Sequence, residues 1–134
     1  MPVIAVVDDD TWVRESLKSL IRSIGHEVRV FASAEEFLSS AHRKADCLIL
    51  DVRLPGMRGI ELHRHLLARM CQAPVIFITA HASDERARSE AASDWTAAYL
   101  IKPFTEDELL GAVAAALNWK TGLLTQTGSP RRSP

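Results

Sequence analysis

Five short apolar runs alternate along the chain with longer segments whose apolar residues recur every three or four positions. The runs are too short for helices and end at polar or turn-forming residues, which is typical of strands buried on both faces. They cover residues 3–7, 28–31, 47–51, 74–79 and 98–101. The longer segments predict amphipathic helices. We therefore expect an α/β protein in which helices cover both faces of a parallel sheet.

The predicted helices begin and end at recognisable signals. They cover residues 11–24, 33–41, 60–70, 84–93 and 105–117. The first has an apolar stripe that reaches Ile24 and is ended by Gly25, because glycine readily adopts the left-handed conformation that follows a helix. Residues 33–36 and 105–108 have the spacing of capping boxes, and Ser83 is expected to cap the fourth helix.

Composition places these elements in one domain. The chain has 134 residues, of which 47% are hydrophobic, so it is long and apolar enough to bury a core. Its net charge is −1, without the basic face that nucleic-acid binding requires. Residues 120–134 are rich in Thr, Gly, Ser, Pro and Arg, which predicts a flexible tail after a domain over residues 1–119. We see neither a signal peptide nor a transmembrane run and expect a cytoplasmic location.

Polar groups stand at the carboxyl ends of four predicted strands. Asp8 and Asp9 follow the first strand, Asp51 ends the third, Thr79 ends the fourth and Lys102 follows the fifth. In a parallel sheet these ends share one edge, which is where ligands bind. Three carboxylates held close together repel one another, and a hard divalent ion such as Mg²⁺ relieves that repulsion. The lysine and the threonine hydroxyl add donors suited to the oxygens of a transferred phosphoryl group.

These residues stand in motifs that resemble a known family. The motifs are Val6-Val7-Asp8-Asp9, Leu50-Asp51 with Leu54-Pro55-Gly56, Thr79-Ala80, and Tyr99-Leu100-Ile101-Lys102-Pro103-Phe104. In this order and on these elements, they resemble the receiver domain of bacterial two-component response regulators over about residues 3 to 119. Residues 31–38 and 79–81 are most similar to receivers of the nitrogen-fixation regulator type. The resemblance implies a doubly wound, flavodoxin-like (βα)5 fold with strand order 2-1-3-4-5.

The resemblance also implies a role for each site residue. Asp51 would accept the phosphoryl group. Asp9 would bind Mg²⁺ or Mn²⁺ directly and Asp8 largely through water, with the main-chain carbonyl of Arg53 as a further ligand. Thr79 and Lys102 would bind the phosphoryl oxygens.

Further positions match features that receivers use for switching. Tyr99 matches the aromatic residue that turns inward on activation, and the Lys102–Pro103 peptide is cis in the family. Arg53 and His81 match positions that tune the lifetime of the phosphoryl group. The chain would then catalyse only its own phosphotransfer and a slow autodephosphorylation.

The expected partners follow from the same resemblance. A histidine kinase or a histidine phosphotransfer protein would donate the phosphoryl group and dock on the first helix, where Trp12 and Val13 are candidates. We expect no output domain, so the signal would leave by homodimerisation or by binding a protein effector through the fourth helix, fifth strand and last helix. No nucleic acid or membrane partner is expected. Asp94 and Trp95 replace the usual Gly-Ala turn, so either Asp94 is left-handed or the turn is remodelled, with Trp95 a possible partner contact.

Three alternatives remain open. Residues 8–10 match the Asp-x-Asp motif of haloacid-dehalogenase-type phosphatases, with Asp8 as nucleophile, but that interpretation leaves Asp51 without a role. The chain could also be a receiver fold that only binds partners, or a truncated DNA-binding response regulator.

His63 and His65 lie two positions apart on a predicted helix, and both are expected to be solvated rather than to share a metal ion.

Overall fold

Five parallel strands form a single sheet in the order β2-β1-β3-β4-β5. The computed structural model describes residues 2–40, 44–80 and 85–125, with the backbone alone at 85–87 and 119–125. The strands are β1 (Val3–Val7), β2 (Glu27–Phe31), β3 (Cys47–Asp51), β4 (Val75–Thr79) and β5 (Thr96–Ile101). The predicted α/β class, the parallel pairing and the predicted strand order are confirmed.

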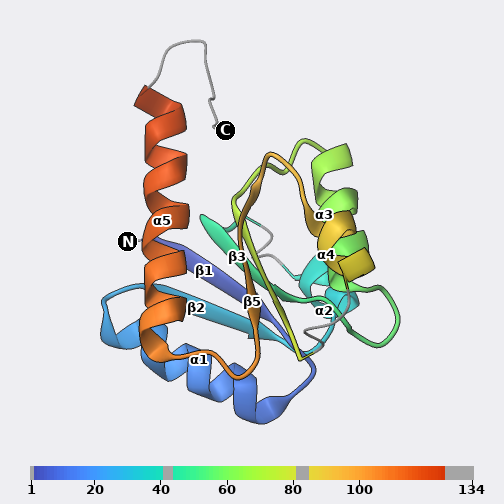
Figure 1. The fold of residues 1–134 in the computed structure, drawn as a ribbon, viewed down its shortest axis with the longest axis horizontal. Coiled ribbons are helices and arrows are strands. Elements are labelled where there is room, and N and C mark those ends of the chain that lie inside the picture. The colour runs from blue at the N-terminus through green and yellow to red at the C-terminus, as the bar shows by residue number, and fades with distance from the viewer. Residues whose placement is uncertain (1, 41–43, 81–84, 126–134) are drawn as a thin grey trace.

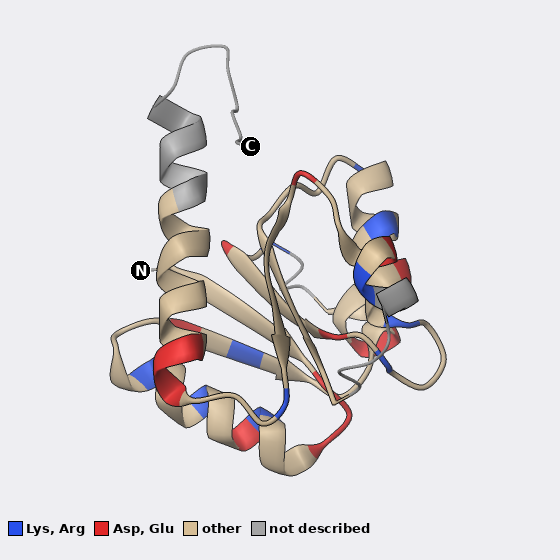
Figure 2. Cartoon of the chain, in the orientation of Figure 1, with Lys and Arg blue, Asp and Glu red and all other residues tan. Residues whose placement is uncertain are grey.

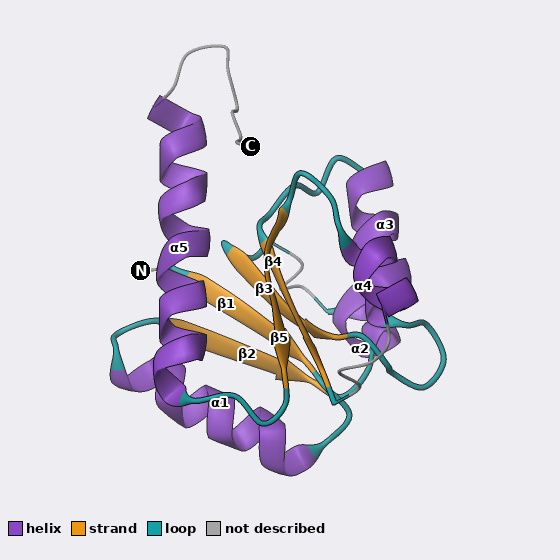
Figure 3. Ribbon diagram, viewed as in Figure 1, coloured by secondary structure: helices purple, strands orange, loops and turns teal. Residues whose placement is uncertain are grey.

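Helices connect successive strands and cover both faces of the sheet. They are α1 (Thr11–Ser23), α2 (Ala34–Ser39), α3 (Gly59–Ala68), α4 (Glu85–Ala91) and α5 (Glu106–Thr125). Helices α1 and α5 lie on one face, and α2, α3 and α4 lie on the other (Figure 1). The loops gather at the two ends of the strands (Figure 3), so the residues that follow the carboxyl ends of the strands share one edge.

Two apolar clusters hold these layers together. One lies between the sheet and α2, α3 and α4, and the other lies between the sheet and α1 and α5. Every residue of β3 and β4 is buried, as expected for central strands of a parallel sheet. In α1 the buried residues are Leu17 and Ile21, whereas Ile24 is 43% exposed. The predicted apolar stripe is therefore wrong at its last residue.

Several helix ends differ from the predicted ones. Helix α5 runs to Thr125, so the chain is still helical beyond residue 119, where the pattern placed the end of the domain. Helix α3 begins at Gly59 and ends at Ala68, and Met70 follows with the left-handed φ of 62°. The predicted cap at Ser83 lies outside the described residues. No helix in the described part of the chain is long and apolar enough to cross a membrane.

The prediction that His63 is solvated is wrong. Its side chain is 4% exposed and its ring meets that of Phe77 edge to face, with centroids 5.7 Å apart. Burial disfavours the charged imidazolium and lowers the pKa of His63 to about 4. Its Nε2 atom has no hydrogen-bond partner among the described residues. The signal in the sequence was its spacing from Ile60 and Leu66, which places all three on one side of α3.

The turn before β5 is remodelled rather than left-handed. Neither Asp94 nor Trp95 has a positive φ, since Met70 is the only described non-glycine residue that does. Instead Thr96 N–H donates to the main-chain oxygen of Ser93 (3.1 Å), and the Ser93 hydroxyl accepts from Trp95 N–H (3.2 Å). The Thr96 hydroxyl donates to the main-chain oxygen of Ala91 (2.5 Å). Side-chain hydroxyls thus replace the glycine at this position.

Thr96→Val is expected to lower the free energy of unfolding by about 1 kcal/mol, because the carbonyl of Ala91 loses its donor in a half-buried position. Urea unfolding followed by circular dichroism measures the change. Equal midpoints for the variant and the parent chain would show that the Thr96 hydroxyl does not contribute to the stability of this turn.

Candidate functional site

Four polar side chains meet at the carboxyl edge of the sheet. Asp51 and Thr79 are the last residues of β3 and β4, Asp8 follows β1, and Lys102 follows β5. Because these strands are neighbours, their ends come together, and the chain is acidic where β1 leads into α1 (Figure 2). Asp8, Thr79 and Asp51 are buried, with exposed fractions of 0%, 1% and 6%. The predicted grouping of these residues is therefore observed, with Asp9 exposed beside them.

Lys102 connects the two buried carboxylates. Its Nζ donates to Oδ2 of Asp8 at 2.9 Å and to Oδ2 of Asp51 at 3.4 Å. Its own N–H donates to the main-chain oxygen of Thr79 at 2.7 Å, which ties the end of β5 to the end of β4. The Lys102–Pro103 peptide bond is cis, as expected. The ammonium group is thus held between the carboxylates of two different strands.

Main-chain N–H groups orient the two carboxylates, and an arginine side chain holds the backbone of Asp8. Asp10 N–H donates to Oδ1 of Asp8 (2.9 Å), and Arg53 N–H donates to Oδ1 of Asp51 (3.2 Å). Arg14, one turn into α1, donates from Nη1 to the main-chain oxygen of Asp8 (2.8 Å). Arg14 was not predicted as a site residue, and an arginine one turn after an acid pair was the only signal for it.

The electrostatics of the site reflect this crowding. Burial, and then the negative charge of Asp8, raise the pKa of Asp51 to about 6, against the opposing effects of Lys102 and of the Arg53 N–H. Burial alone would lower the pKa of Lys102, but its bond to Asp8 and the charges of Asp51 and Asp8 raise it overall. The lysine is therefore charged at neutral pH and offsets only part of the repulsion between the carboxylates.

The acidic residues are suited to a hard divalent ion. One carboxylate oxygen from each of Asp8, Asp9 and Asp51 lies within 4.8 Å of the others. Oxygen ligands of this kind are those that Mg²⁺ and Mn²⁺ prefer. A bound cation would also offset the negative charge of Asp8, which together with burial raises the pKa of Asp51, so the residues present fit such an ion.

Close packing beneath Asp51 explains why α3 begins with a glycine. A Cβ atom on Gly59 would lie 2.1 Å from the main-chain oxygen of Asp51. Any larger residue would push the first turn of α3 away from β3. The approach of this helix therefore depends on the missing side chain.

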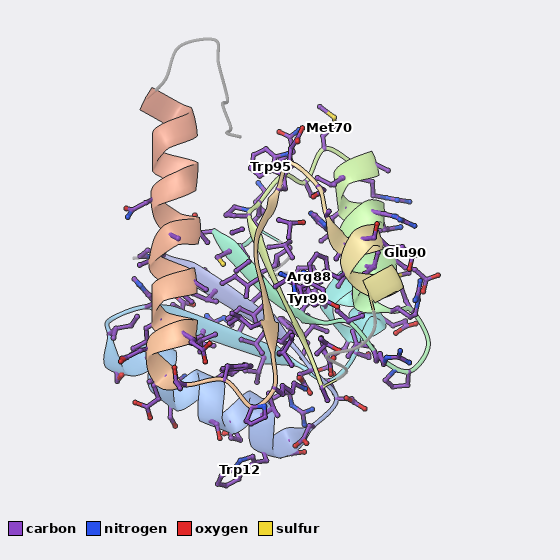
Figure 4. The ribbon with its side chains drawn as sticks, in the orientation of Figure 1. Trp12, Met70, Arg88, Glu90, Trp95 and Tyr99 are labelled. Atoms are coloured by element: carbon purple, nitrogen blue, oxygen red, sulfur yellow. The ribbon has the colours of Figure 1, made fainter. Side chains whose placement is uncertain are left out.

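Tyr99 lies on the face of β5 that is turned towards α2, α3 and α4. It packs partly against the apolar cluster between the sheet and these three helices. Its ring centroid is 6.5 Å from that of Phe77, and the guanidinium carbon of Arg88 lies 5.2 Å from the Tyr99 centroid (Figure 4). The aromatic ring is thus half-buried between β4 and α4. A change in the position of the Tyr99 ring would therefore change its contact with Arg88 of α4.

The remaining predicted residues are spread over the surface. Trp12 is 79% exposed, whereas Val13 is half-buried and packs partly against the cluster between the sheet and helices α1 and α5. Trp95 is half-buried and lies with Met70 at the end of the molecule opposite Trp12 (Figure 4). Arg53 is exposed in the loop after β3. His81 lies outside the described residues.

A family model described as the response regulator receiver domain matches residues 4–114. The chain belongs to this family. Receiver domains are the phosphoacceptor modules of two-component signalling and are not classical enzymes, so the haloacid-dehalogenase alternative is set aside. The predicted resemblance is confirmed.

Individual relatives support the same assignment of this receiver domain. Response regulator protein TodT of Pseudomonas putida is 44% identical over 132 residues, which cover 98% of this chain and 57% of TodT. Transcriptional regulatory protein FixJ of Azorhizobium caulinodans is 40% identical over 113 residues, which cover 84% of this chain and 53% of FixJ. The receiver therefore spans about half the length of the curated relatives it matches.

A solved structure bears on the acidic cluster. Response regulator TrrA of Thermotoga maritima, determined in complex with Mg²⁺ and BeF, is 32% identical to this chain with a TM-score of 0.76. The match covers 87% of this receiver and 100% of the TrrA chain.

Proposed function

We propose that Asp51 is the phosphoacceptor of this receiver. A carboxylate oxygen of Asp51 attacks the phosphorus of a phosphohistidine, the P–N bond breaks, and its electron pair leaves on the imidazole nitrogen. The product is an aspartyl phosphate on this chain and a free histidine on the donor. The single observation that carries the proposal is that Asp51 ends β3 buried beside both Asp8 and the ammonium of Lys102.

The neighbouring residues prepare Asp51 for this reaction. Lys102 holds a positive charge where negative phosphoryl oxygens would arrive, and Thr79 offers a hydroxyl at the end of the adjacent strand. Asp8, Asp9, Asp51 and the main-chain carbonyl of Arg53 would hold Mg²⁺ or Mn²⁺. When bound, the ion supplies positive charge that offsets the crowded carboxylates and keeps Asp51 ionised.

The output depends on a second set of residues. Thr79 binds the new phosphoryl group, Tyr99 moves inward, and the surface formed by α4, β5 and α5 changes shape. Such a change is a shift between two populations that phosphorylation biases. Arg53 and His81 tune how slowly the aspartyl phosphate is hydrolysed, which resets the receiver.

The proposed partners are a histidine kinase or a histidine phosphotransfer protein on one side. Trp12, strongly exposed at the start of α1, is available for docking such a donor. On the other side, a protein effector or a second copy of the chain would use the α4-β5-α5 surface, with Trp95 near it. The cytoplasmic location and the absence of a nucleic acid partner stay predictions from the sequence.

A second possibility is that this receiver controls DNA binding in a longer regulator. FixJ is named as a transcriptional regulatory protein, and this chain covers 53% of it. Determining the coding sequence on both sides of the segment tests this directly. If a DNA-binding domain is encoded in the same reading frame, the receiver would act on that domain of its own chain instead of on a separate protein.

Chemical trapping locates the phosphoryl group. Treating the chain with acetyl phosphate and Mg²⁺, and then with borohydride, should convert residue 51 to homoserine, because an acyl phosphate is reduced to an alcohol. Peptide mass spectrometry identifies the position, and a sample without acetyl phosphate is the control. Homoserine at a different residue would contradict the assignment of Asp51, and its absence everywhere would support a receiver that only binds partners.

A further inference from the structure

The loop between β3 and α3 makes hydrogen bonds at both ends and in its middle. At its ends, Val52 N–H donates to the main-chain oxygen of Ile78 (2.9 Å) and Gly59 N–H donates to that of Val52 (3.2 Å). In the middle, Met57 N–H donates to Oε2 of Glu35 (3.0 Å), a residue of α2 that is 22 positions away in the sequence. The Glu35 carboxylate is therefore a contact between the loop and a different helix.

The backbone of the loop is shaped to receive this carboxylate. Gly56 has a φ of +73°, and a Cβ atom there would lie 2.7 Å from Oε2 of Glu35. Glycine is favoured because other residues rarely adopt this φ, and a Cβ atom there would displace the Glu35 carboxylate that accepts from Met57 N–H. The approach of Glu35 to Gly56 and Met57 is thus built into the local chain conformation.

The backbone of Glu35 is held in place by helix α2. Ser33 caps the helix by accepting from Glu36 N–H (3.0 Å), and Ala34 and Phe37 on either side are fully buried. The Met57 N–H lowers the pKa of the Glu35 carboxyl, so the acceptor is charged at neutral pH and forms the stronger kind of hydrogen bond.

We propose that Glu35 is a positioning residue for the metal and phosphoryl site. It holds the loop in the conformation in which Arg53 N–H donates to Oδ1 of Asp51 (3.2 Å), and from which the Arg53 carbonyl would bind the cation. Glu35 itself does not contact the acidic cluster in any described interaction. The inference rests on the proposed function of Asp51 and adds to it a residue of α2, a helix that no site residue occupies.

Amide exchange in the metal-free protein tests the contact itself. Replacing Glu35 by alanine should accelerate exchange of the Met57 N–H by about five- to tenfold, the size expected for one charge-assisted hydrogen bond at an exposed position. Nuclear magnetic resonance follows this single amide. An unchanged Met57 exchange rate would overturn the proposal at its first step.

Mg²⁺ affinity tests the consequence. In Glu35→Ala the Kd for Mg²⁺, measured by calorimetry, should rise about three- to fivefold. Without the Glu35 contact, part of the binding free energy of the ion is used to order the loop between β3 and α3. Glu35→Gln keeps an acceptor oxygen at the same length and should restore most of the affinity. Glu36→Ala is the matched control, since Glu36 lies in the same helical turn but accepts from Ala32 N–H (3.0 Å).

The control separates positioning from stability. Glu36→Ala should lower the thermal midpoint while leaving the Kd for Mg²⁺ unchanged. Equal rises in Kd for the two alanine variants, or no rise in Glu35→Ala, would contradict a positioning role for Glu35. Glu35→Ala should still yield homoserine at residue 51 when Mg²⁺ is saturating, so a failure of this inference leaves the assignment of Asp51 intact.

Discussion

Asp51→Asn is expected to abolish phosphoryl uptake and, in the same protein, to raise the free energy of unfolding. The amide oxygen of asparagine is not a nucleophile for phosphoryl transfer, so labelling by acetyl phosphate should fall to background. At pH 8 in EDTA, the variant should be more stable than the parent chain by roughly 2 to 3 kcal/mol. Loss of activity with a gain in stability is typical of a residue held in place for function.

The stability gain follows from the raised pKa of Asp51. Its pKa is about 6 in the folded protein against an ordinary 3.8, because of burial and the charge of Asp8. Between these values the folded state holds a proton that the unfolded state has lost, so stability falls as the pH rises through this range. Asparagine carries no charge and escapes that loss. The difference between the two proteins should therefore be near zero at pH 4 and complete above pH 7.

Urea unfolding of both proteins at pH 4 and pH 8 measures this difference. Mg²⁺ provides the internal control, because saturating metal should stabilise the parent chain more than Asp51→Asn and reduce the gap. Equal unfolding midpoints for Asp51→Asn and the parent chain at pH 8 without metal would mean that Lys102 already offsets the negative charge of Asp51.

His63→Leu is expected to protect the protein against mild acid. In the parent chain the pKa of His63 is about 4 in the folded state against an ordinary 6.5, because burial disfavours the imidazolium. Between these values the unfolded state binds a proton that the folded state does not, so stability falls as the pH drops. The full effect is roughly 3 kcal/mol and is absent above pH 7. Leucine has a similar volume and nothing to protonate.

The measurement is the difference in free energy of unfolding between His63→Leu and the parent chain at pH 7 and pH 4.5. It should shift in favour of the variant as the pH falls, in the direction opposite to the Asp51 effect. His65→Gln on the same helix is the matched control, because His65 is half-buried and bonds to Arg69 at 3.1 Å. A parallel loss of stability in His63→Leu and the parent chain would show that His63 is protonated within the fold.

Local patterns in the sequence were enough to predict the sheet and the edge that carries the site. Strands β1 and β3 have the predicted bounds, because an apolar run ended by a carboxylate marks both the strand and its exit. The reciprocal bonds between Thr105 and Glu108 were also predicted, since a capping box depends only on residues three positions apart (2.8 and 3.0 Å). Such features are decided within one turn or one strand.

The sequence by itself therefore determined the α/β class, the parallel sheet and the presence of Asp8, Asp51, Thr79 and Lys102 at the same edge. Only the tertiary structure decided how those groups meet, with Lys102 Nζ 2.9 Å from Asp8 and 3.4 Å from Asp51. It also decided that His63 is buried against Phe77 and that Glu35 reaches Met57. These are contacts between separate elements, and their distances depend on how the layers pack. Hydrophobic periodicity records which side of an element is buried but not which partner it meets there.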